Sequence, residues 1–201
     1  MSRPTERGAC RRERGVSLLE LILFIVIVGA GIAGVLGVWR VTAQGSADPL
    51  IQKQALAIAE AYLEEALAMP FTYCDPDDVH AATAQSDAAV NPADPTRCAA
   101  TLEAIGAEPG ETRGSGTTPY DNVNDYASLP AAAPASIDGT AIPGLGAYQV
   151  SVAVVAQSLT DGAAPIPAAA SQRVTVTVTG PGNTTVTLDG YRTRYAPNAL
   201  P

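Results

Sequence analysis

Around residue 15 the sequence reads Arg14-Gly15-Val16-Ser17-Leu18-Leu19-Glu20, where a basic leader meets a long apolar run. Residues 16–39 carry one charged side chain, Glu20, and are long enough to cross a bilayer as a helix. A charge inside such a helix costs roughly 2.5–3.5 kcal/mol on insertion scales, so Glu20 needs a partner. A cut after Gly15 would supply one, because it frees the backbone amine of Val16.

This combination of a glycine, an apolar helix and an acid resembles the type IV prepilin signal. The resemblance implies that Gly15 is the last leader residue and that Val16 is the cleaved, N-methylated terminus, although the family more often has phenylalanine there. It also implies that Glu20 pairs with the Val16 amine of a neighbouring subunit during assembly. The implied partners are a prepilin peptidase, other pilin or pseudopilin subunits and an inner-membrane assembly platform.

Two later segments extend the resemblance to most of the chain. Residues 71–78 and 120–126 are similar to segments of prepilin-like proteins of the MSHA pilus (mannose-sensitive haemagglutinin). Within that family the implied role is a minor pilin-like subunit in pilus assembly. A type II secretion pseudopilin shares the same N-terminal features and stays open as an alternative.

Three other kinds of protein would account for part of the N-terminal segment. An ordinary secretory signal has a shorter apolar core and a small-x-small cleavage site, whereas this core is more than twenty residues long. A plain single-span anchor explains the apolar run but neither Glu20 nor Gly15. The third alternative is a membrane-anchored periplasmic binding module that does not polymerise.

Charge predicts which side of the membrane each part occupies. The leader, residues 1–15, has five arginines and two glutamates, and a basic flank stays in the cytoplasm. The rest would then be periplasmic, in a single-pass inner-membrane protein that later enters a pilus or pseudopilus. The whole chain has a net charge of −8, so loss of a leader of +3 leaves about −11. A body this acidic argues against nucleic-acid binding, which needs clustered lysine and arginine.

The three cysteines indicate one disulfide. Cys10 lies in the leader and would leave with it, so Cys74 and Cys98 remain in an oxidising compartment. A bond between them closes a loop of about 25 residues, which the loop-entropy treatment values at roughly 3 kcal/mol. The alternative is two unrelated thiols.

Residues 40–70 have the spacing of an amphipathic helix. Apolar side chains recur on one side, and the other side receives Gln52, Lys53, Glu60, Glu64 and Glu65. Asp48 is a good N-cap and Pro49 a good first helical residue, so we expect a break or kink at residues 45–49. Pro70 should end the helix.

Residues 71–143 contain few large apolar side chains, so we expect loops that bury little surface and are tied by the Cys74–Cys98 bond. Residues 101–105 fit one short helix or strand. The alanine-rich run 131–135 has the composition of a linker.

Three strands are predicted in the last region, residues 144–201. Residues 148–155 and 173–179 alternate with valines on one face, and residues 184–195 follow a turn at Gly180-Pro181-Gly182-Asn183. Such strands form an antiparallel meander, and the amphipathic helix laid across it gives an α+β fold of two layers. A pilin-like fold, with one long N-terminal helix, is also what the resemblance implies.

No catalytic constellation is visible, so we expect a protein that is not an enzyme. His80 is the single histidine and has no nucleophile motif around it. A zinc site would need several cysteines or histidines at close spacing.

Calcium is the one cofactor that the sequence indicates. Asp121, Asn122, Asn124 and Asp125 offer four oxygen-bearing side chains within five residues, and Asp75-Pro76-Asp77-Asp78 adds three carboxylates. Calcium takes about six to eight hard oxygen ligands. The EF-hand pattern is absent, however, and turns explain the same residues, because Asp and Asn side chains cap their own backbone.

Overall fold

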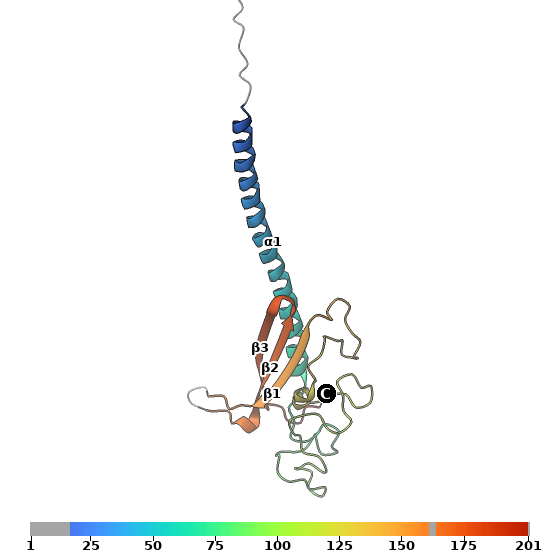
Figure 1. Ribbon diagram of the computed structural model, residues 1–201. Helices are drawn as coiled ribbons and strands as arrows, with labels where there is room; N and C mark the ends of the chain where they lie inside the picture. The colour runs from blue at the N-terminus through green and yellow to red at the C-terminus, as the bar shows by residue number, and fades with distance from the viewer. Residues whose placement is uncertain (1–16, 161–163, 201) are drawn as a thin grey trace, which may run out of the picture. The chain divides into compact units, whose positions relative to one another are not determined.

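A computed structural model of the chain describes residues 17–160 and 164–200, with the backbone alone at 40–48 (Figure 1). The chain divides into two compact units, Met1–Ala47 and Asp48–Pro201. One helix runs through the described part of the first unit and continues into the second. The second unit also contains a three-stranded sheet and the long loop region.

The helix α1 spans Leu18–Ala68. The predicted break at residues 45–49 is wrong, because these residues are helical and Pro49 lies inside α1. Asp48 therefore does not begin a second helix. Proline lacks the amide hydrogen for one bond of the helical ladder, but the neighbouring bonds can carry the helix past it. The predicted end before Pro70 is confirmed.

The strands form one antiparallel sheet in the order β1-β2-β3. Their bounds are Gln149–Ala156 for β1, Ser171–Gly180 for β2 and Thr184–Thr193 for β3. Val176, near the middle of β2, pairs with Val152 of β1 and with Leu188 of β3. The predicted meander is confirmed.

Two short 3₁₀ turns flank β2. The turn η2 (Ala168–Ala170) precedes it, and η3 (Pro181–Asn183) joins it to β3. In η3 the backbone is left-handed at Gly182, with φ of 66°, and at Asn183, with φ of 59°. Glycine and asparagine tolerate this conformation better than other residues, which explains the predicted turn at this position.

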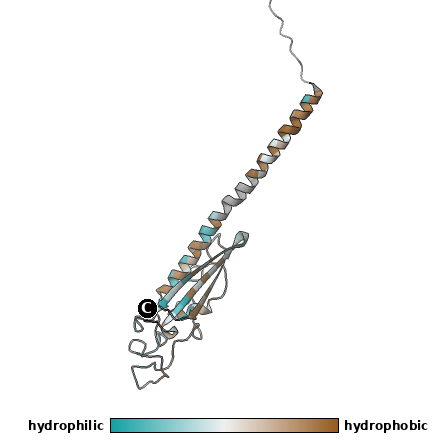
Figure 2. Ribbon diagram, turned by 90° about the vertical axis from the view of Figure 1, so that its left-hand side faces the viewer, coloured by the Kyte–Doolittle hydropathy of each residue, from teal (hydrophilic) through white to brown (hydrophobic). Residues whose placement is uncertain are grey.

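The core of the second unit lies between one face of α1 and one face of the sheet. The α1 face consists of small and aromatic or branched side chains, namely Ala55, Ile58, Ala59, Tyr62 and Ala66. The sheet face consists of alternate residues, namely Tyr148, Val150, Val152, Val154, Val174, Val176 and Val178. Figure 2 shows hydrophilic and hydrophobic turns mixed in this part of α1, as expected for a helix with one buried face. Both predicted faces are confirmed.

The loop region contributes more to this core than the sequence predicts. Between residues 69 and 148 the one helical element is the 3₁₀ helix η1 (Val123–Ser128). Phe71, Tyr120, Val123 and Tyr126 nevertheless belong to the core. The expectation of little burial is therefore wrong in this respect. The loop region has few large side chains, but these pack against residues of α1 and the sheet that are distant in sequence.

The run 131–135 is not a free linker. Ala132 and Val150 exchange two backbone hydrogen bonds, of 3.2 and 2.8 Å, at the edge of β1. The hydroxyl of Tyr62 accepts a bond from the amide of Ala135 at 3.0 Å and donates one to its carbonyl at 3.1 Å. Backbone groups make these contacts, and composition does not reveal them.

Glu65 was predicted on the polar side of the helix, but its side chain is mostly buried and binds Arg113. The guanidinium donates two bonds of 2.6 Å to the two carboxylate oxygens, a bidentate geometry. The same guanidinium donates to the carbonyls of Ala135 and Ser136 at 3.2 and 3.0 Å. The hydroxyl of Tyr126 donates to Glu65 at 2.8 Å. These bonds connect α1 to three parts of the loop region, namely the segment of Arg113, the helix η1 and residues 135–136.

The predicted disulfide between Cys74 and Cys98 is present, with a Cα–Cα distance of 5.4 Å. Both residues are fully buried, in a second and smaller apolar cluster. Leu102 pairs with Cys74 through an isolated bridge, and residues 101–105 otherwise form neither a helix nor a strand.

Breaking the disulfide should destabilise the folded chain. We expect the Cys74→Ala, Cys98→Ala variant to lose about 3 kcal/mol of unfolding free energy, because its unfolded chain is no longer constrained by the closed loop. Urea unfolding of the oxidised protein and of the variant measures the difference. Reducing agent should lower the stability of the wild type and leave the double variant unchanged. Equal stability of the two proteins would contradict this assignment.

Candidate functional site

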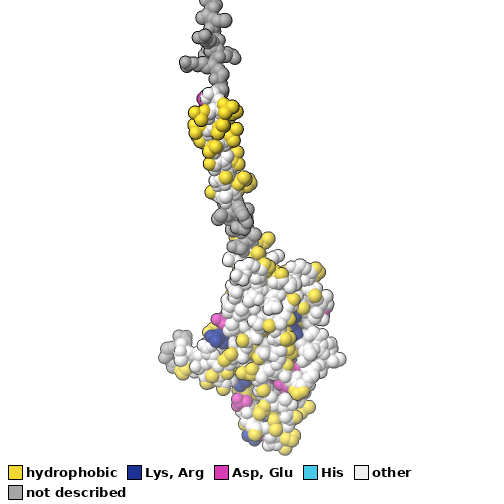
Figure 3. All heavy atoms as spheres, in the orientation of Figure 1, with side chains coloured by type: hydrophobic (Ala, Val, Ile, Leu, Met, Phe, Trp, Pro, Cys, Tyr) yellow, Lys and Arg dark blue, Asp and Glu magenta, His cyan; other side chains and the backbone are white. Residues whose placement is uncertain are grey.

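The first candidate site is the apolar part of α1. Leu18–Trp39 is 22 residues long and is apolar enough to cross a membrane. At 1.5 Å per residue it extends about 33 Å, close to the thickness of a bilayer core. Its side chains are exposed throughout, and Figure 3 shows apolar atoms covering the visible face of this segment. By length and composition, lipid or other apolar helices suit this surface.

Glu20 is the one charged side chain between residues 18 and 39. It lies in the first turn of α1 and is exposed, and its amide donates a hydrogen bond to the Oγ of Ser17 at 3.2 Å. Ser17 thus caps the helix just before the acid. The predicted cleavage residues Gly15 and Val16 lie outside the described residues, as does the predicted amine partner of Glu20.

The second candidate site is the acidic part of the loop region, where calcium was predicted. Two of the four predicted ligands are used by the protein itself. Asn122 caps η1 by accepting from the amide of Asn124 at 3.4 Å, and its side-chain amide donates to Thr72 at 2.7 Å. The side-chain oxygen of Asn124 accepts from Gln172. Turn and core contacts therefore account for both asparagines.

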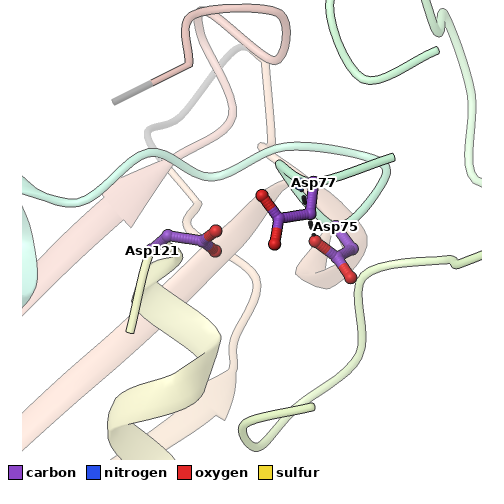
Figure 4. A group of neighbouring side chains, drawn as sticks. All are labelled: Asp75, Asp77 and Asp121. Carbon is purple, nitrogen blue, oxygen red and sulfur yellow. Dashed lines mark hydrogen bonds between the residues drawn. The ribbon is translucent and has the colours of Figure 1, made fainter. Parts of the chain in front are cut away.

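The two aspartates of the predicted set belong to different acidic groups. The first group is Asp75, Asp77 and Asp121, each with one carboxylate oxygen within 4.8 Å of the others. In Figure 4 these carboxylates come from two segments, the loop after Cys74 and the residue before the cap of η1. Burial, together with the charge of Glu111, raises the pKa of Asp121 to about 7.

The second group is Glu103, Glu108 and Asp125, whose oxygens also lie within 4.8 Å of one another. Burial, followed by the charges of Glu108 and Asp125, raises the pKa of Glu103 to about 9. Burial and the charge of Asp125 raise the pKa of Glu108 to about 8. The sequence analysis missed both glutamates. They stand 17 and 22 residues before Asp125 in an irregular loop, and no local pattern links them to it.

Asp78 has a structural role beside these groups. One of its oxygens accepts from the amides of His80 at 2.8 Å and Ala99 at 3.0 Å. The other accepts from the amides of Ala100 at 2.7 Å and Thr101 at 3.0 Å. The carboxylate therefore joins the two ends of the disulfide loop.

The single histidine also has a structural contact. The Nδ1 of His80 lies 3.0 Å from the carbonyl oxygen of Arg97, across the same loop. This contact connects the two sides of the disulfide loop.

Comparison with protein-family models, with curated proteins and with solved structures gave no match to this chain. Its function is therefore inferred from its own residues. Two features enter that inference, the lone acid at the start of the apolar helix and the buried carboxylates of the loop region.

Removing the Asp78 carboxylate should weaken the loop. We expect Asp78→Ala to cost about 2 kcal/mol in urea unfolding, because four amides lose a charged acceptor. Burial raises the pKa of Asp78, but the amides outweigh it and lower the pKa to about 2. The folded pKa lies below the unfolded one, so the stabilisation is full above about pH 4 and disappears as the pH falls towards 2. Glu64→Ala, on the exposed side of α1, is the control and should change stability by less than about 0.5 kcal/mol. A pH-independent difference between wild type and Asp78→Ala would contradict this account.

Proposed function

We propose that the chain is a prepilin that is processed to a minor pilin-like subunit and takes part in assembly of a type IV pilus of the MSHA type. The observation that carries the proposal is the spacing of Gly15, Val16 and Glu20 at the start of an apolar helix. The glycine marks the cleavage point and the acid lies five residues beyond it. In this account the catalysis belongs to the prepilin peptidase, and the chain is its substrate.

Electrostatics explains why cleavage and assembly would be linked. The Glu20 carboxylate is costly in hydrocarbon, and the released amine of Val16 carries the opposite charge. When a subunit enters the filament, its Glu20 meets the Val16 amine of a neighbour, and each charge relieves the cost of the other. The pair then sets the axial register of the subunits, while the apolar helices pack in the filament core.

Charge and sulfur chemistry agree with export of the second unit. The basic leader would stay in the cytoplasm, and residues after the apolar helix would be periplasmic. The Cys74–Cys98 disulfide suits an oxidising compartment. The partners in this proposal are the prepilin peptidase, other pilin or pseudopilin subunits and the inner-membrane assembly platform.

Two other functions would use the same features differently. A type II secretion pseudopilin shares the whole N-terminal argument, and the genes beside the coding sequence would separate it from a pilus component. A membrane-anchored binding module would use the acidic loop as its site and would not need Glu20. The acidic groups favour this second candidate, and the assembly experiment below distinguishes it.

The mature N-terminus tests the processing step. We expect mass spectrometry of the membrane-extracted protein to show a chain that begins with N-methylated Val16. Gly15→Val should block cleavage, because a bulky side chain replaces the residue at the cut, and should leave a chain that retains residues 1–15. A wild-type protein that still begins with Met1 contradicts the proposal.

The acid tests the assembly step. We expect Glu20→Ala to insert into the membrane normally but to decrease by at least about tenfold in sheared filaments, since it loses an ion pair made in hydrocarbon. Quantitative immunoblots of the membrane and filament fractions measure both amounts. Ser17→Ala is the matched control, because it removes the helix cap and retains the acid. Equal amounts of Glu20→Ala and wild type in filaments would favour the anchored module.

A further inference from the structure

The group formed by Glu103, Glu108 and Asp125 combines three carboxylates that the protein does not neutralise. One oxygen of each lies within 4.8 Å of the others. Both oxygens of Glu103, Oε2 of Glu108 and Oδ1 of Asp125 are buried and receive no well-aligned hydrogen bond. A weaker bond from the side chain of Asn124 lowers the pKa of Glu103, but burial outweighs it. Buried polar groups are normally paired, so four such oxygens in one place require an explanation.

Asp125 supplies the most specific observation. Its side chain is fully buried, with an exposed fraction of 0%. Its Oδ2 accepts from the amides of Asp121 at 2.9 Å and Asn122 at 2.7 Å, which holds the carboxylate in one orientation. Oδ1 accepts no well-aligned hydrogen bond and is therefore free to bind a cation together with the two glutamates. A carboxylate fixed in this way is a preformed ligand.

Two of the cationic side chains that the structure describes form ion pairs. Their ion pairs are Arg113 with Glu65, at 2.6 Å, and Arg194 with Asp87, at 4.0 Å. Arg194 also lies over the ring of Phe71, 4.1 Å from its centre. Neither of these ion pairs includes a member of the group. Burial lowers the pKa of Arg194, and the charges of Tyr73, Asp87 and Glu103 oppose that shift, so Arg194 offsets part of the charge of the group from a longer distance.

We propose that Glu103, Glu108 and Asp125 bind a hard divalent cation of the size of calcium. All three donors are carboxylates, the ligand type that calcium prefers. Calcium–oxygen distances of about 2.3–2.6 Å place ligand atoms up to about 5 Å apart across the ion. One oxygen of each of the three carboxylates lies within 4.8 Å of the others, close enough to share one ion. Bidentate carboxylates and water can supply the remaining ligands.

The neighbouring acidic group strengthens the attraction for a cation. Asp75, Asp77 and Asp121 form a second set of three carboxylates, and Oδ1 of Asp121 is also buried without a partner. Asp75 and Asp125 raise the pKa of Asp121 by repulsion, after burial and Glu111, so the two groups share one negative region. A divalent cation at the more buried group would lower the repulsion in both.

Protons are the competing explanation. A buried carboxylate group can remain neutral by binding protons, and the raised pKa values of Glu103 and Glu108 describe that state in the absence of a cation. The two explanations differ in one measurable respect. A protonated group has no specific response to calcium, whereas a cation site binds one ion and gains stability from it.

The experiment uses the full chain in detergent, with chelator or with calcium at about a hundredfold excess over its dissociation constant. We expect calcium to raise the melting temperature by about 5–10 °C, as for a ligand that binds the folded state alone. Titration calorimetry should show about one ion bound per chain. Magnesium at the same concentration should give a smaller rise, and a rise as large as that of calcium overturns the assignment to calcium.

Glu103→Gln removes the charge but keeps an acceptor oxygen for the side chain of Asn124, the one hydrogen-bond donor that acts on the Glu103 carboxylate. We expect this variant to be at least as stable as wild type in chelator and to lose most of the calcium response. Glu108→Gln is a second variant with the same expectation, in case the first does not fold. Glu60→Gln, the same change on the exposed side of α1, is the control and should respond like wild type. No calcium response in the wild type, or an equal response in the wild type and both site variants, overturns the proposal.

Discussion

The ion pair between Arg113 and Glu65 connects α1 to the loop region, and the same guanidinium also binds the carbonyls of Ala135 and Ser136. The two side chains are only 11% and 17% exposed, so their attraction is screened less than that of a surface pair. The guanidinium also lies over the ring of Tyr62, 4.6 Å from its centre. Because the loop region has few large apolar side chains, such directed contacts replace much of the burial that holds an ordinary domain together.

Two kinds of charge therefore occur in this chain. Glu65 has a partner within the second unit, and its cost of burial is offset there. Glu20, in the apolar part of α1, and the carboxylates around Asp125 form no ion pair with the described side chains. An unpaired charge in an apolar or buried position is costly, which is the reason for proposing a partner for each. The proposals of a neighbouring subunit's amine and of a divalent cation rest on this common reasoning.

Local patterns predicted much of the fold. Alternation with valines on one face located β1 and β2, because a strand with one buried face repeats every two residues, and the turn after β2 located β3. The buried stripe of α1 followed from helical spacing, and the position of Cys10 in the predicted leader left Cys74 and Cys98 as the pair. The break at Pro49 was predicted wrongly, since good N-terminal capping residues indicate where a helix can begin but do not stop one that is already formed.

The acidic site was predicted only in part. Asp121 and Asp125 were predicted and lie in the two acidic groups, whereas the two predicted asparagines are engaged in hydrogen bonds within the protein. Their real partners, Thr72 and Gln172, lie about fifty residues away. Glu103 and Glu108 were missed for the same reason. The loops that bring them to Asp125 have no periodicity, and their arrangement is set by contacts between distant backbone groups.

The disulfide loop has a further consequence for the evolution of the chain. Its two ends are joined by a covalent bond and by Asp78, which contacts backbone amides alone. None of residues 85–97 is buried, although Asp87 pairs with Arg194 and the side chains of Asn91 and Asp94 accept local hydrogen bonds. At the other exposed positions a substitution should change stability little, because surface side chains contribute little to it. Sequence can therefore vary there at small cost while the base of the loop keeps its geometry.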